Sequence, residues 1–294
     1  MPHDVIVVGG SYAGLSAALQ LARARRDVLV IDSGQRRNRF ASHAHGFLGR
    51  DGIDPAAIIA EARSQLLAYP TVRFADAAVA AVARSDARFE VTAAGEAHFA
   101  SRLILATGII DELPVIPGLV ERWGRSVFHC PYCHGYELDR GRVGVIATSV
   151  AAMHQAMLLT DWGEVTVLIH GSFAPEPKEI DKLTALGATI EPVAIVSVTG
   201  TADAVLGDGR VLSFAGLFLA PQHRLPDIVL DLGCGVSDDG FGPFLATNPY
   251  KETTVPGIYA CGDVARVSGS IALAVADGAI AGVGAHQSLI EGLA

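Results

Sequence analysis

The stretch Val5-Ile6-Val7-Val8-Gly9-Gly10-Ser11-Tyr12-Ala13-Gly14 decides the fold of this 294-residue chain. Its apolar run is typical of a parallel strand that is covered on both faces. The glycines predict a tight turn, and residues 15–24 repeat apolar positions at helical spacing. A second apolar run, 28–31, ends on Asp32. This order is the dinucleotide-binding fingerprint in its proper context. Ser11 replaces the middle glycine, where a side chain crowds a pyrophosphate but can also donate a hydrogen bond to it.

The same order of elements occurs a second time. Residues 143–149 (VGVIATS) align with residues 5–11, and a helical pattern follows. The next apolar run, 165–169, ends on His170, at the place that corresponds to Asp32. Two nucleotide-type strand–helix–strand units predict an α/β fold with two Rossmann-like domains.

Two later apolar runs flank the second unit. Residues 102–108 (RLILATG) end in small residues, and residues 255–263 (VPGIYACGD) end on Asp263, ahead of an alanine-rich helical pattern at 271–286. We therefore predict a discontinuous first domain, in which the second is inserted, with the stretch 240–249 as one strand of the hinge between them. The predicted boundaries are 1–112 and 243–294 for the first domain and 118–240 for the second.

Composition and charge bound the class of protein. Half of the residues are hydrophobic and 18% are charged, which is typical of a compact chain with a large core. The net charge of −9 argues against a nucleic-acid binder, so the basic cluster 36–39 is interpreted as solvated surface or local anion contacts. No uninterrupted apolar run approaches the ~20 residues that span a bilayer. The sequence start lacks a signal-peptide layout, and four cysteines suit a reducing compartment, so we expect a cytoplasmic protein with no membrane partner.

A pair of cysteines lies just ahead of the second unit, in His129-Cys130-Pro131-Tyr132-Cys133-His134. Cysteines at this spacing close a small ring, and their disulfide forms and opens readily. Pro131 suits the first turn of a helix, whose dipole lowers the pKa of a thiol at its start. Cys234 and Cys261 have no cysteine near them in the sequence, so each is interpreted as a small buried residue.

Two other chemistries use parts of this hexapeptide. Cys130, Cys133 and His134 match the c-type haem attachment pattern, but that reaction normally requires export. The two cysteines and the flanking histidines also form a partial zinc-ligand set. Zinc sites usually take a second ligand pair from elsewhere, and the sequence holds no second CxxC and no HxxxH. We therefore favour a redox-active pair and predict no metal.

The motifs VVGGSYAG, ATG, CPYC and PGIYACGD, in this order and followed by a helix, resemble the low-molecular-weight thioredoxin reductase family over essentially the whole chain. The resemblance implies an FAD domain from the two chain ends, a central pyridine-nucleotide-type domain that carries the dithiol, and a homodimer. It also implies the FAD contacts: the pyrophosphate at Gly9, Gly10, Ser11 and Gly14, the adenosine ribose at Asp32, the ribityl chain at Asp263, and the pyrimidine edge of the flavin at the helix start, Ser270.

The second unit departs from this family. Nucleotide binding would need glycines where the chain has Ala147 and Ser149, so that the backbone can approach a pyrophosphate. NAD would require a carboxylate where the chain has His170, and NADP would require arginines just after it, but no cation occurs before Lys178. These losses together predict a domain that kept its fold and lost its nicotinamide.

A narrower resemblance fits this loss. The CPYCHG segment, the segment 38–52 with its HAHGF, and the helix 269–286 are similar to the thioredoxin-reductase-like dithiol oxidases that form the disulfides of gliotoxin and holomycin. The resemblance implies that electrons pass from a small-molecule dithiol through CxxC to FAD and then to dioxygen. It places His43 and His45 in a segment beside the isoalloxazine ring, where they shape a substrate pocket, move protons, or make only a loop hydrogen bond.

The family also implies roles at the cysteine pair. Cys133 is the thiol on the flavin side, and Cys130 exchanges with the substrate. His134 stands where thioredoxin reductases carry an acid–base aspartate, and a histidine that titrates near neutrality can accept a thiol proton and then stabilise the thiolate. His129 shares this work or has a packing role.

Three other functions stay open at this point. The first is an NADPH-dependent thioredoxin reductase, whose substrate would be a thioredoxin-like protein. The second is a disulfide reductase that receives electrons from a protein donor such as ferredoxin. The third is a non-catalytic flavin redox sensor that uses the cysteine pair as a switch.

Overall fold

The computed structural model describes residues 2–85, 88–171 and 173–290. Unit 1 consists of Met1–Arg39, Phe47–Asp111 and His223–Ala294, and unit 2 consists of Phe40–Gly46 and Glu112–Gln222. Both units are α/β structures whose central strands pair in parallel, and the second is inserted in the first. The predicted fold class is therefore confirmed.

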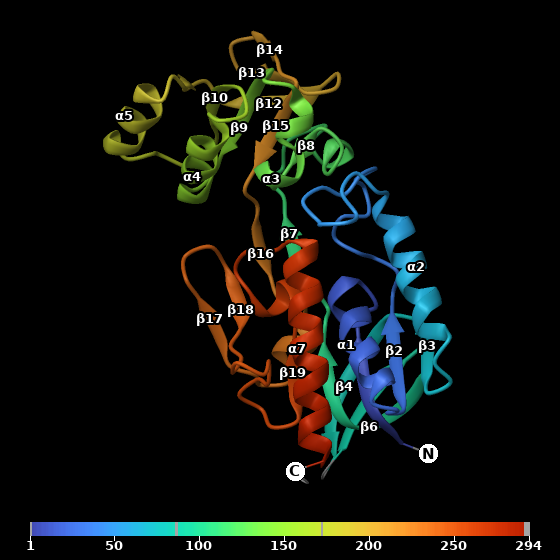
Figure 1. Cartoon of the computed structure of the whole chain (residues 1–294). Helices are drawn as coiled ribbons and strands as arrows, with labels where there is room; N and C mark the ends of the chain where they lie inside the picture. Colours follow the sequence, from blue (N-terminus) through green and yellow to red (C-terminus); the bar gives the residue numbers. More distant parts are fainter. Residues whose placement is uncertain (1, 86–87, 172, 291–294) are drawn as a thin grey trace. The chain divides into compact units, whose positions relative to one another are not determined.

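Unit 1 is built on one sheet, shown with blue, teal and orange strands in Figure 1. The strand order is β3-β2-β1-β6-β5-β4, and β19 lies beside β6. The pairs among β1, β2, β3, β6 and β19 are parallel, whereas β4, β5 and β6 pair antiparallel. The strands are β1 (His3–Val8), β2 (Val28–Asp32), β3 (Val72–Asp76), β4 (Val79–Ser85), β5 (Arg88–Ala93), β6 (Glu96–Leu105) and β19 (Ile258–Ala260).

The central strand β1 is buried on both faces, as its apolar sequence predicts. Successive side chains of a strand point to opposite faces of the sheet. Val7 therefore packs in one core with Leu21 of helix α1 (Tyr12–Arg23), whereas Ile6 packs in the other with Val91. Both cores are needed to bury this strand, which explains why β1 lacks the polar alternation of a half-exposed strand.

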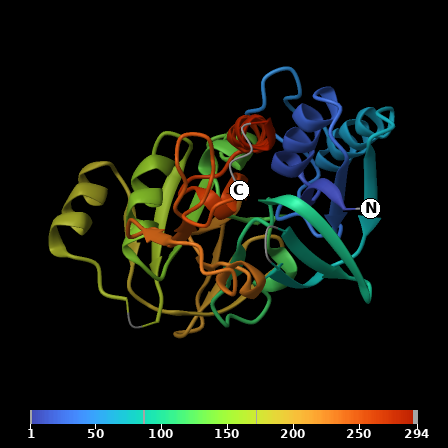
Figure 2. The same ribbon diagram turned by 90° about the horizontal axis from the view of Figure 1, so that it is seen from below.

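Helix α1 packs closely against helix α7 (Ile271–Ile290), which Figure 2 shows nearly end-on beside α1. A methyl group on Gly278 would lie 2.0 Å from the carbonyl oxygen of Ala13, and one on Gly282 would lie 2.5 Å from that of Ala17. Because both contacts advance together along the two chains, the helices run in the same direction. The N-terminal end of α7 therefore extends roughly two turns, ~9 Å, past the N-terminal end of α1.

By length and composition, α7 is the one helix in the described ranges that is apolar enough to cross a membrane, with a hydropathy of 1.2. One face of this helix packs into unit 1, and 39% of its apolar stretch is buried. Asp277, in the middle of α7, is 5% exposed. Its carboxylate pairs with Lys251 at 2.8 Å and with Arg266 at 3.1 Å. The helix therefore contributes a buried charge network to unit 1, in addition to its apolar contacts.

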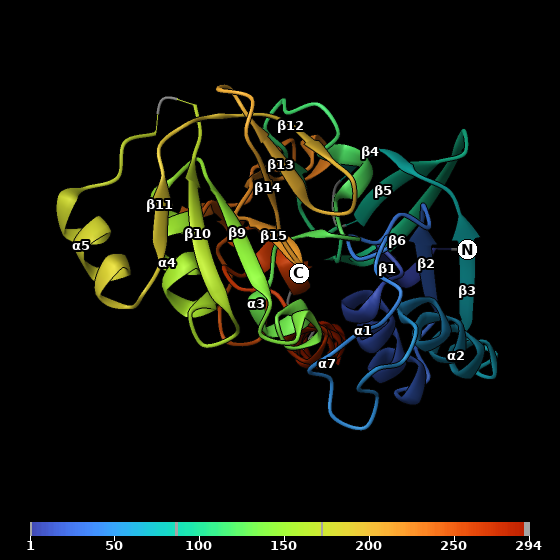
Figure 3. The same ribbon diagram turned by 90° about the horizontal axis from the view of Figure 1, so that it is seen from above.

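Unit 2 repeats the architecture on a smaller scale, and Figure 3 shows its parallel strands side by side. The strand order is β11-β10-β9-β15-β8, and a separate antiparallel sheet is formed by β12, β13 and β14. The principal elements are β8 (Val127–Phe128), α3 (Pro131–His134), β9 (Arg142–Ala147), α4 (Val150–Leu159), β10 (Glu164–Ile169), α5 (Pro177–Ala185), β11 (Thr189–Glu191), β12 (Ile195–Thr199), β13 (Asp203–Leu206), β14 (Val211–Ser213) and β15 (Gly216–Leu219). The second strand–helix–strand unit predicted from the sequence is the β9-α4-β10 segment.

The second boundary of the inserted unit lies earlier than the sequence indicated. Residues 223–240, predicted in the inserted domain, belong to unit 1 because Leu225 and Val229 are buried in its core. The crossing lies instead at β16 (Gln222–Arg224), which pairs with β7 (Ile110–Glu112). The stretch 240–249, expected as a hinge strand, contains β18 (Pro243–Leu245), which pairs with β17 (Val236–Asp238) within unit 1.

The close contact of α1 and α7 predicts the sign of one substitution. Gly→Ala in a helix interior ordinarily stabilises by about 1 kcal/mol. At Gly278 the added methyl group would meet backbone, so we expect Gly278→Ala to destabilise the protein by about 2–4 kcal/mol. Urea unfolding checks this expectation. Ala276→Gly, at an exposed position of the same helix, is the control and should cost about 1 kcal/mol. A stabilised Gly278→Ala variant would contradict the packing.

Candidate functional site

The fingerprint turn lies tightly against the end of β6. Gly9 has a φ of +103°, a region that favours glycine. A side chain on Gly9 would place its Cβ 2.3 Å from the carbonyl oxygen of Ala106, and one on Gly14 would place it 1.8 Å from the oxygen of Gly9. A side chain on Gly10 would meet Cβ of Asp32 at 2.8 Å. The turn therefore brings its backbone and the carboxylate of Asp32 to one edge of the sheet.

Ser11 is the N-cap residue of α1, with an extended backbone. Its hydroxyl makes no capping hydrogen bond, so the first N–H groups of α1 are left for another acceptor. A helix start with uncapped N–H groups favours an anion. This arrangement fits the pyrophosphate of FAD, because the glycines let the backbone make a tight turn that leads directly into this helix start.

Asp263 lies in a 3-10 turn (Gly262–Ala265) that follows β19. Its carboxylate accepts a hydrogen bond from Nη1 of Arg37 at 3.1 Å. The same guanidinium binds Asp111 through Nε at 2.9 Å and through Nη2 at 2.6 Å. Burial lowers the pKa of Arg37, but the hydrogen bonds and charges of the two carboxylates outweigh it and raise that pKa overall. Arg37 thus fixes the orientation of the carboxylate that the family implies for the ribityl chain.

Arg37 and Asp111 were missed by the sequence analysis. The sequence predicts solvated surface or local anion contacts for the basic cluster 36–39, and for Arg37 the structure shows anion contacts, with two carboxylates. The sequence does contain a signal for this contact. Asp111 follows the apolar run 102–108, and the carboxyl ends of parallel strands lie at one edge of a sheet. Two further atoms of this segment, Nε of Arg36 and Oδ1 of Asn38, are buried without a hydrogen-bond partner in the described part of the chain. Polar atoms of this kind are expected where a polar cofactor binds.

Ser270 caps the start of α7, where its Oγ accepts a hydrogen bond from the N–H of Leu273 at 3.2 Å. The residue is exposed, and the following N–H groups point out of the helix start. Its predicted contact with the flavin remains a prediction.

Cys130 and Cys133 form a disulfide, with their Cα atoms 5.3 Å apart. Cys130 is the N-cap residue of α3, and Pro131 stands at its first position, as predicted. Both cysteines are only partly exposed, whereas Tyr132 between them is 69% exposed and its ring contacts the ring of Trp162 edge-on at 5.2 Å. The structure therefore holds a sulfur pair within reach of a ligand, beside an aromatic surface. The separate roles of the two sulfurs remain predictions.

His134 differs from the near-neutral base that the sequence predicts. Its ring stacks on Phe128 with the ring centroids 4.3 Å apart. Burial lowers the pKa of His134 to about 4, although the charge of Glu137 raises it and that of His45 lowers it further. In the disulfide state the ring is therefore neutral at pH 7 and can accept a proton.

The segment Phe40–Gly46 belongs to unit 2. Within it, Nε2 of His45 lies 3.4 Å from Oε1 of Glu137, and the ring centroid of His43 lies 6.3 Å from that of His45. His129 is exposed, and its carbonyl oxygen accepts a hydrogen bond from Gln155. The structure thus brings His45 and Glu137 into the electrostatic surroundings of His134, while the flavin-side or substrate-pocket roles of His43, His45 and His129 remain predictions.

The second nucleotide-type turn lacks the features of the first. Ala147 is fully buried at the end of β9, and Ser149 starts α4 without a capping hydrogen bond. His170 follows β10, and its Nδ1 is buried without a partner among the described residues. Burial lowers the pKa of His170, which favours the neutral ring. The position that binds a ribose or its phosphate in such folds therefore carries neither a carboxylate nor a cation.

Cys234 and Cys261 are buried, free cysteines. Burial raises the pKa of Cys261 to about 12 and also raises that of Cys234, so both thiols are protonated. No group of three metal-ligating side chains occurs in residues 2–85, 88–171 and 173–290.

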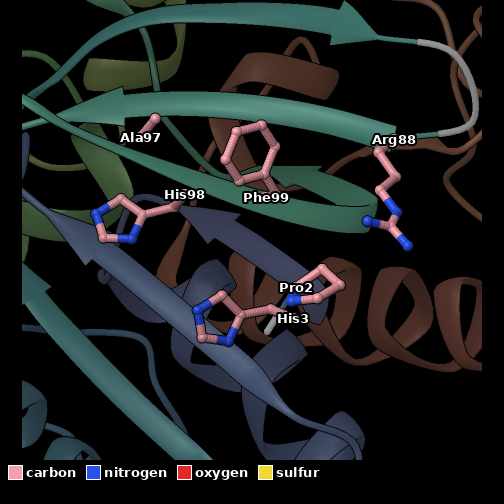
Figure 4. Close-up of a pocket in the computed structure, with 6 residues that line it drawn as sticks. All are labelled: Pro2, His3, Arg88, Ala97, His98 and Phe99. Atoms are coloured by element: carbon pink, nitrogen blue, oxygen red, sulfur yellow. The ribbon is translucent and has the colours of Figure 1, made fainter.

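A surface hollow of about 320 Å³ on unit 1 (Figure 4) lies at the opposite end of β1 from the fingerprint, and its lining consists of Pro2, His3, Arg88, Ala97, His98 and Phe99.

The bridging position of Arg37 predicts a change in cofactor retention. In Arg37→Met, two partly buried carboxylates lose their common partner, so we expect a loss of about 1–3 kcal/mol in unfolding free energy and earlier release of FAD in urea. Flavin fluorescence and far-ultraviolet circular dichroism measure the two effects. Arg39→Met, which removes an exposed guanidinium nearby, is the control. Equal FAD retention in both variants would contradict the positioning of Asp263.

The lowered pKa of His134 predicts a pH dependence of stability. An unfolded histidine titrates near pH 6.5. Because the folded ring stays neutral down to about pH 4, the unfolded chain binds the additional proton between these values. The stabilising contribution is complete above pH 6.5 and is lost as the pH falls towards 4. When the pH is lowered from about 7.5 to 4.5, the free energy of unfolding of wild type should fall by about 1–2 kcal/mol more than that of His134→Gln. Urea unfolding at the two pH values measures this difference. Equal losses would exclude a depressed pKa.

Comparisons with known proteins agree with this geometry. The family model "Pyridine nucleotide-disulphide oxidoreductase" matches residues 3–278. Thioredoxin reductase sirT from Leptosphaeria maculans is 33% identical, over 96% of this chain and 93% of its own length. A solved oxidoreductase from Agrobacterium tumefaciens is 53% identical over 99% of both chains, with a TM-score of 0.95. The solved structure of HlmI is 34% identical over 99% of this chain and 93% of its own, with a TM-score of 0.92. The chain therefore belongs to the pyridine nucleotide-disulphide oxidoreductase family, as a thioredoxin reductase-like, FAD-dependent thiol–disulfide oxidoreductase.

Proposed function

We propose that this protein oxidises a small-molecule dithiol, without a nicotinamide, and uses dioxygen as the final electron acceptor. The observation that carries this proposal is a disulfide in a unit whose nucleotide-type turn has Ala147, Ser149 and a neutral His170. A reductase that draws electrons from NADPH needs a site for its phosphates and ribose. An oxidase that draws electrons from a dithiol does not.

The proposed reaction begins at the disulfide. A substrate thiolate attacks Sγ of Cys130, which forms a mixed disulfide and releases the thiolate of Cys133. The second substrate thiol then attacks the mixed disulfide, and the product leaves with its own disulfide. Cys130 takes up the proton of this second thiol as an S–H group, and His134 holds the proton of the first thiol. Two electrons and two protons have passed from the substrate to the enzyme. When bound, FAD supplies a two-electron acceptor for the enzyme dithiol and passes the electrons to dioxygen, which gives hydrogen peroxide.

His134 is the proposed proton acceptor in this sequence. Its neutral ring carries a free lone pair in the disulfide state, because burial lowers its pKa. Once Cys133 becomes a thiolate, a negative charge arises one residue away. An adjacent anion favours the charged form of an imidazole, so the pKa of His134 rises when a proton must be held. Protonation of His134 and release of the thiolate are therefore coupled.

The surroundings of the disulfide support a substrate with an apolar body. Tyr136 is 83% exposed and Tyr132 is 69% exposed, and Trp162 lies against Tyr132. Exposed aromatic rings bind flat or apolar ligands at low cost in conformational entropy. The thioredoxin reductase names of the relatives favour a second candidate, an NADPH-dependent reductase of a thioredoxin-like protein. As further proposals, the protein is cytoplasmic and forms a homodimer, and the partly exposed Leu273, Ile280 and Val283 on α7 supply apolar surface for the dimer.

Anaerobic reduction of the holoenzyme distinguishes these functions. We expect dithiothreitol to bleach the flavin absorbance, and NADPH or NADH to leave it unchanged over the same time. Cys130→Ser and Cys133→Ser should each lower the rate of flavin bleaching by the dithiol at least 100-fold. In these variants the electrons have no path through the disulfide. Cys261→Ser, at a buried thiol, is the matched control.

The other outcomes assign the other functions. Rapid bleaching by NADPH would establish the NADPH-dependent reductase instead. Bleaching by reduced ferredoxin alone would establish a reductase fed by a protein donor. If a dithiol reduces the cysteine pair but no combination of reductant and acceptor gives turnover, the remaining assignment is a non-catalytic redox sensor.

A further inference from the structure

Gln155 is a buried amide in a helix face that is otherwise apolar. It lies on α4 and is 5% exposed, next to Ala152, Met153 and Ala156, which are fully buried. Its Nε2 donates a hydrogen bond to the carbonyl oxygen of His129. This carbonyl belongs to the residue just before Cys130. The amide therefore links the disulfide turn to α4, the helix of the second nucleotide-type unit.

The other half of the same amide is unsatisfied in the disulfide state. Oε1 of Gln155 is buried and accepts no hydrogen bond from any described residue. A buried acceptor without a donor costs free energy, and a methionine would fill the same space without that cost. An unsatisfied polar atom in an apolar core indicates a partner in another state of the molecule.

Reduction of the disulfide creates such a partner. When the disulfide accepts two electrons and two protons from a dithiol, Cys130 carries one proton as an S–H group, and the other proton is shared by Cys133 and His134. An S–H group is a hydrogen-bond donor. Oε1 and Nε2 are bonded to the same carbon, and Nε2 already contacts the residue next to Cys130. The new donor therefore arises on the residue next to the one whose carbonyl Nε2 binds.

We propose that Gln155 is a positioning residue that favours the dithiol form of the enzyme, because its Oε1 accepts a hydrogen bond from the thiol of Cys130. This inference rests on the proposed function, in which Cys130 and Cys133 cycle between disulfide and dithiol. The bond from Nε2 to His129 holds the turn in both states, whereas the bond to Oε1 exists only after reduction. Gln155 thereby makes the disulfide a stronger acceptor of substrate electrons.

The test compares the reduction equilibrium of wild type with that of Gln155→Met. Anaerobic holoenzyme is equilibrated with mixtures of reduced and oxidised dithiothreitol, and the thiols of Cys130 and Cys133 are counted by alkylation and mass spectrometry. Gln155→Met removes the unsatisfied acceptor from the oxidised state and the hydrogen bond from the reduced state. Both effects favour the disulfide, so half-reduction should require an about tenfold higher ratio of reduced to oxidised dithiothreitol, equivalent to about 30 mV.

Two further variants keep the test decisive. Met153→Leu, a buried neighbour on α4, is the control and should leave the midpoint within about twofold. Gln155→Asn keeps the amide but shortens its reach, and should shift the midpoint in the same direction if Gln155→Met does not fold. Lower stability with an unchanged midpoint in the folded variant would overturn the proposal and leave only a structural role for Gln155.

The same experiment separates this inference from the proposed function. If dithiothreitol reduces the wild-type disulfide and bleaches the flavin, but the variants have the wild-type midpoint, only the role of Gln155 is lost. If the wild-type disulfide resists reduction, the redox cycle itself is absent, and both proposals are overturned.

Discussion

Unit 1 depends on the close approach of the fingerprint backbone to the end of β6. The carbonyl of Ala106 lies where a side chain on Gly9 would stand, and the carbonyl of Gly9 lies where one on Gly14 would stand. This contact fixes the direction in which α1 leaves the sheet. Helix α1 in turn provides the surface on which α7 packs through its glycines. The places where α1 and α7 start are thus set by positions without side chains.

Unit 2 holds a short turn in place while both of its cysteines stay partly exposed. The four-residue helix α3 has too few hydrogen bonds to be stable alone. Phe128 stacks on His134, Gln155 binds the carbonyl of His129, and Trp162 lies so close to Gly135 that a Cβ there would meet its ring at 2.9 Å. Contacts from β8, α4 and the loop after α4 therefore support the turn, and the cysteines can change their bonding while its backbone stays fixed.

The sequence was sufficient to predict the two domains, the fingerprint, the disulfide position and the helix start at Pro131, because these depend on local patterns. It was not sufficient for contacts between distant segments. The partners of Arg37 come from residues 111 and 263, and no local pattern indicates that these meet. The environment of His134 depends on Phe128 and on burial, so its lowered pKa could not be read from the hexapeptide. The boundary near 222 was misplaced because the apolar residues after it alternate too irregularly to show which core they join.

The discontinuity of unit 1 also has a consequence for how the protein is made. Strand β19 pairs with residues 103–105 of β6, but it is synthesised only after all of unit 2. On the ribosome, that side of β6 and the α1 face destined for α7 remain uncovered until the C-terminal segment emerges. An open strand edge and an apolar helix face invite aggregation during this interval. Unit 1 can therefore complete its fold only after the inserted unit has been synthesised and the last strand has paired with β6.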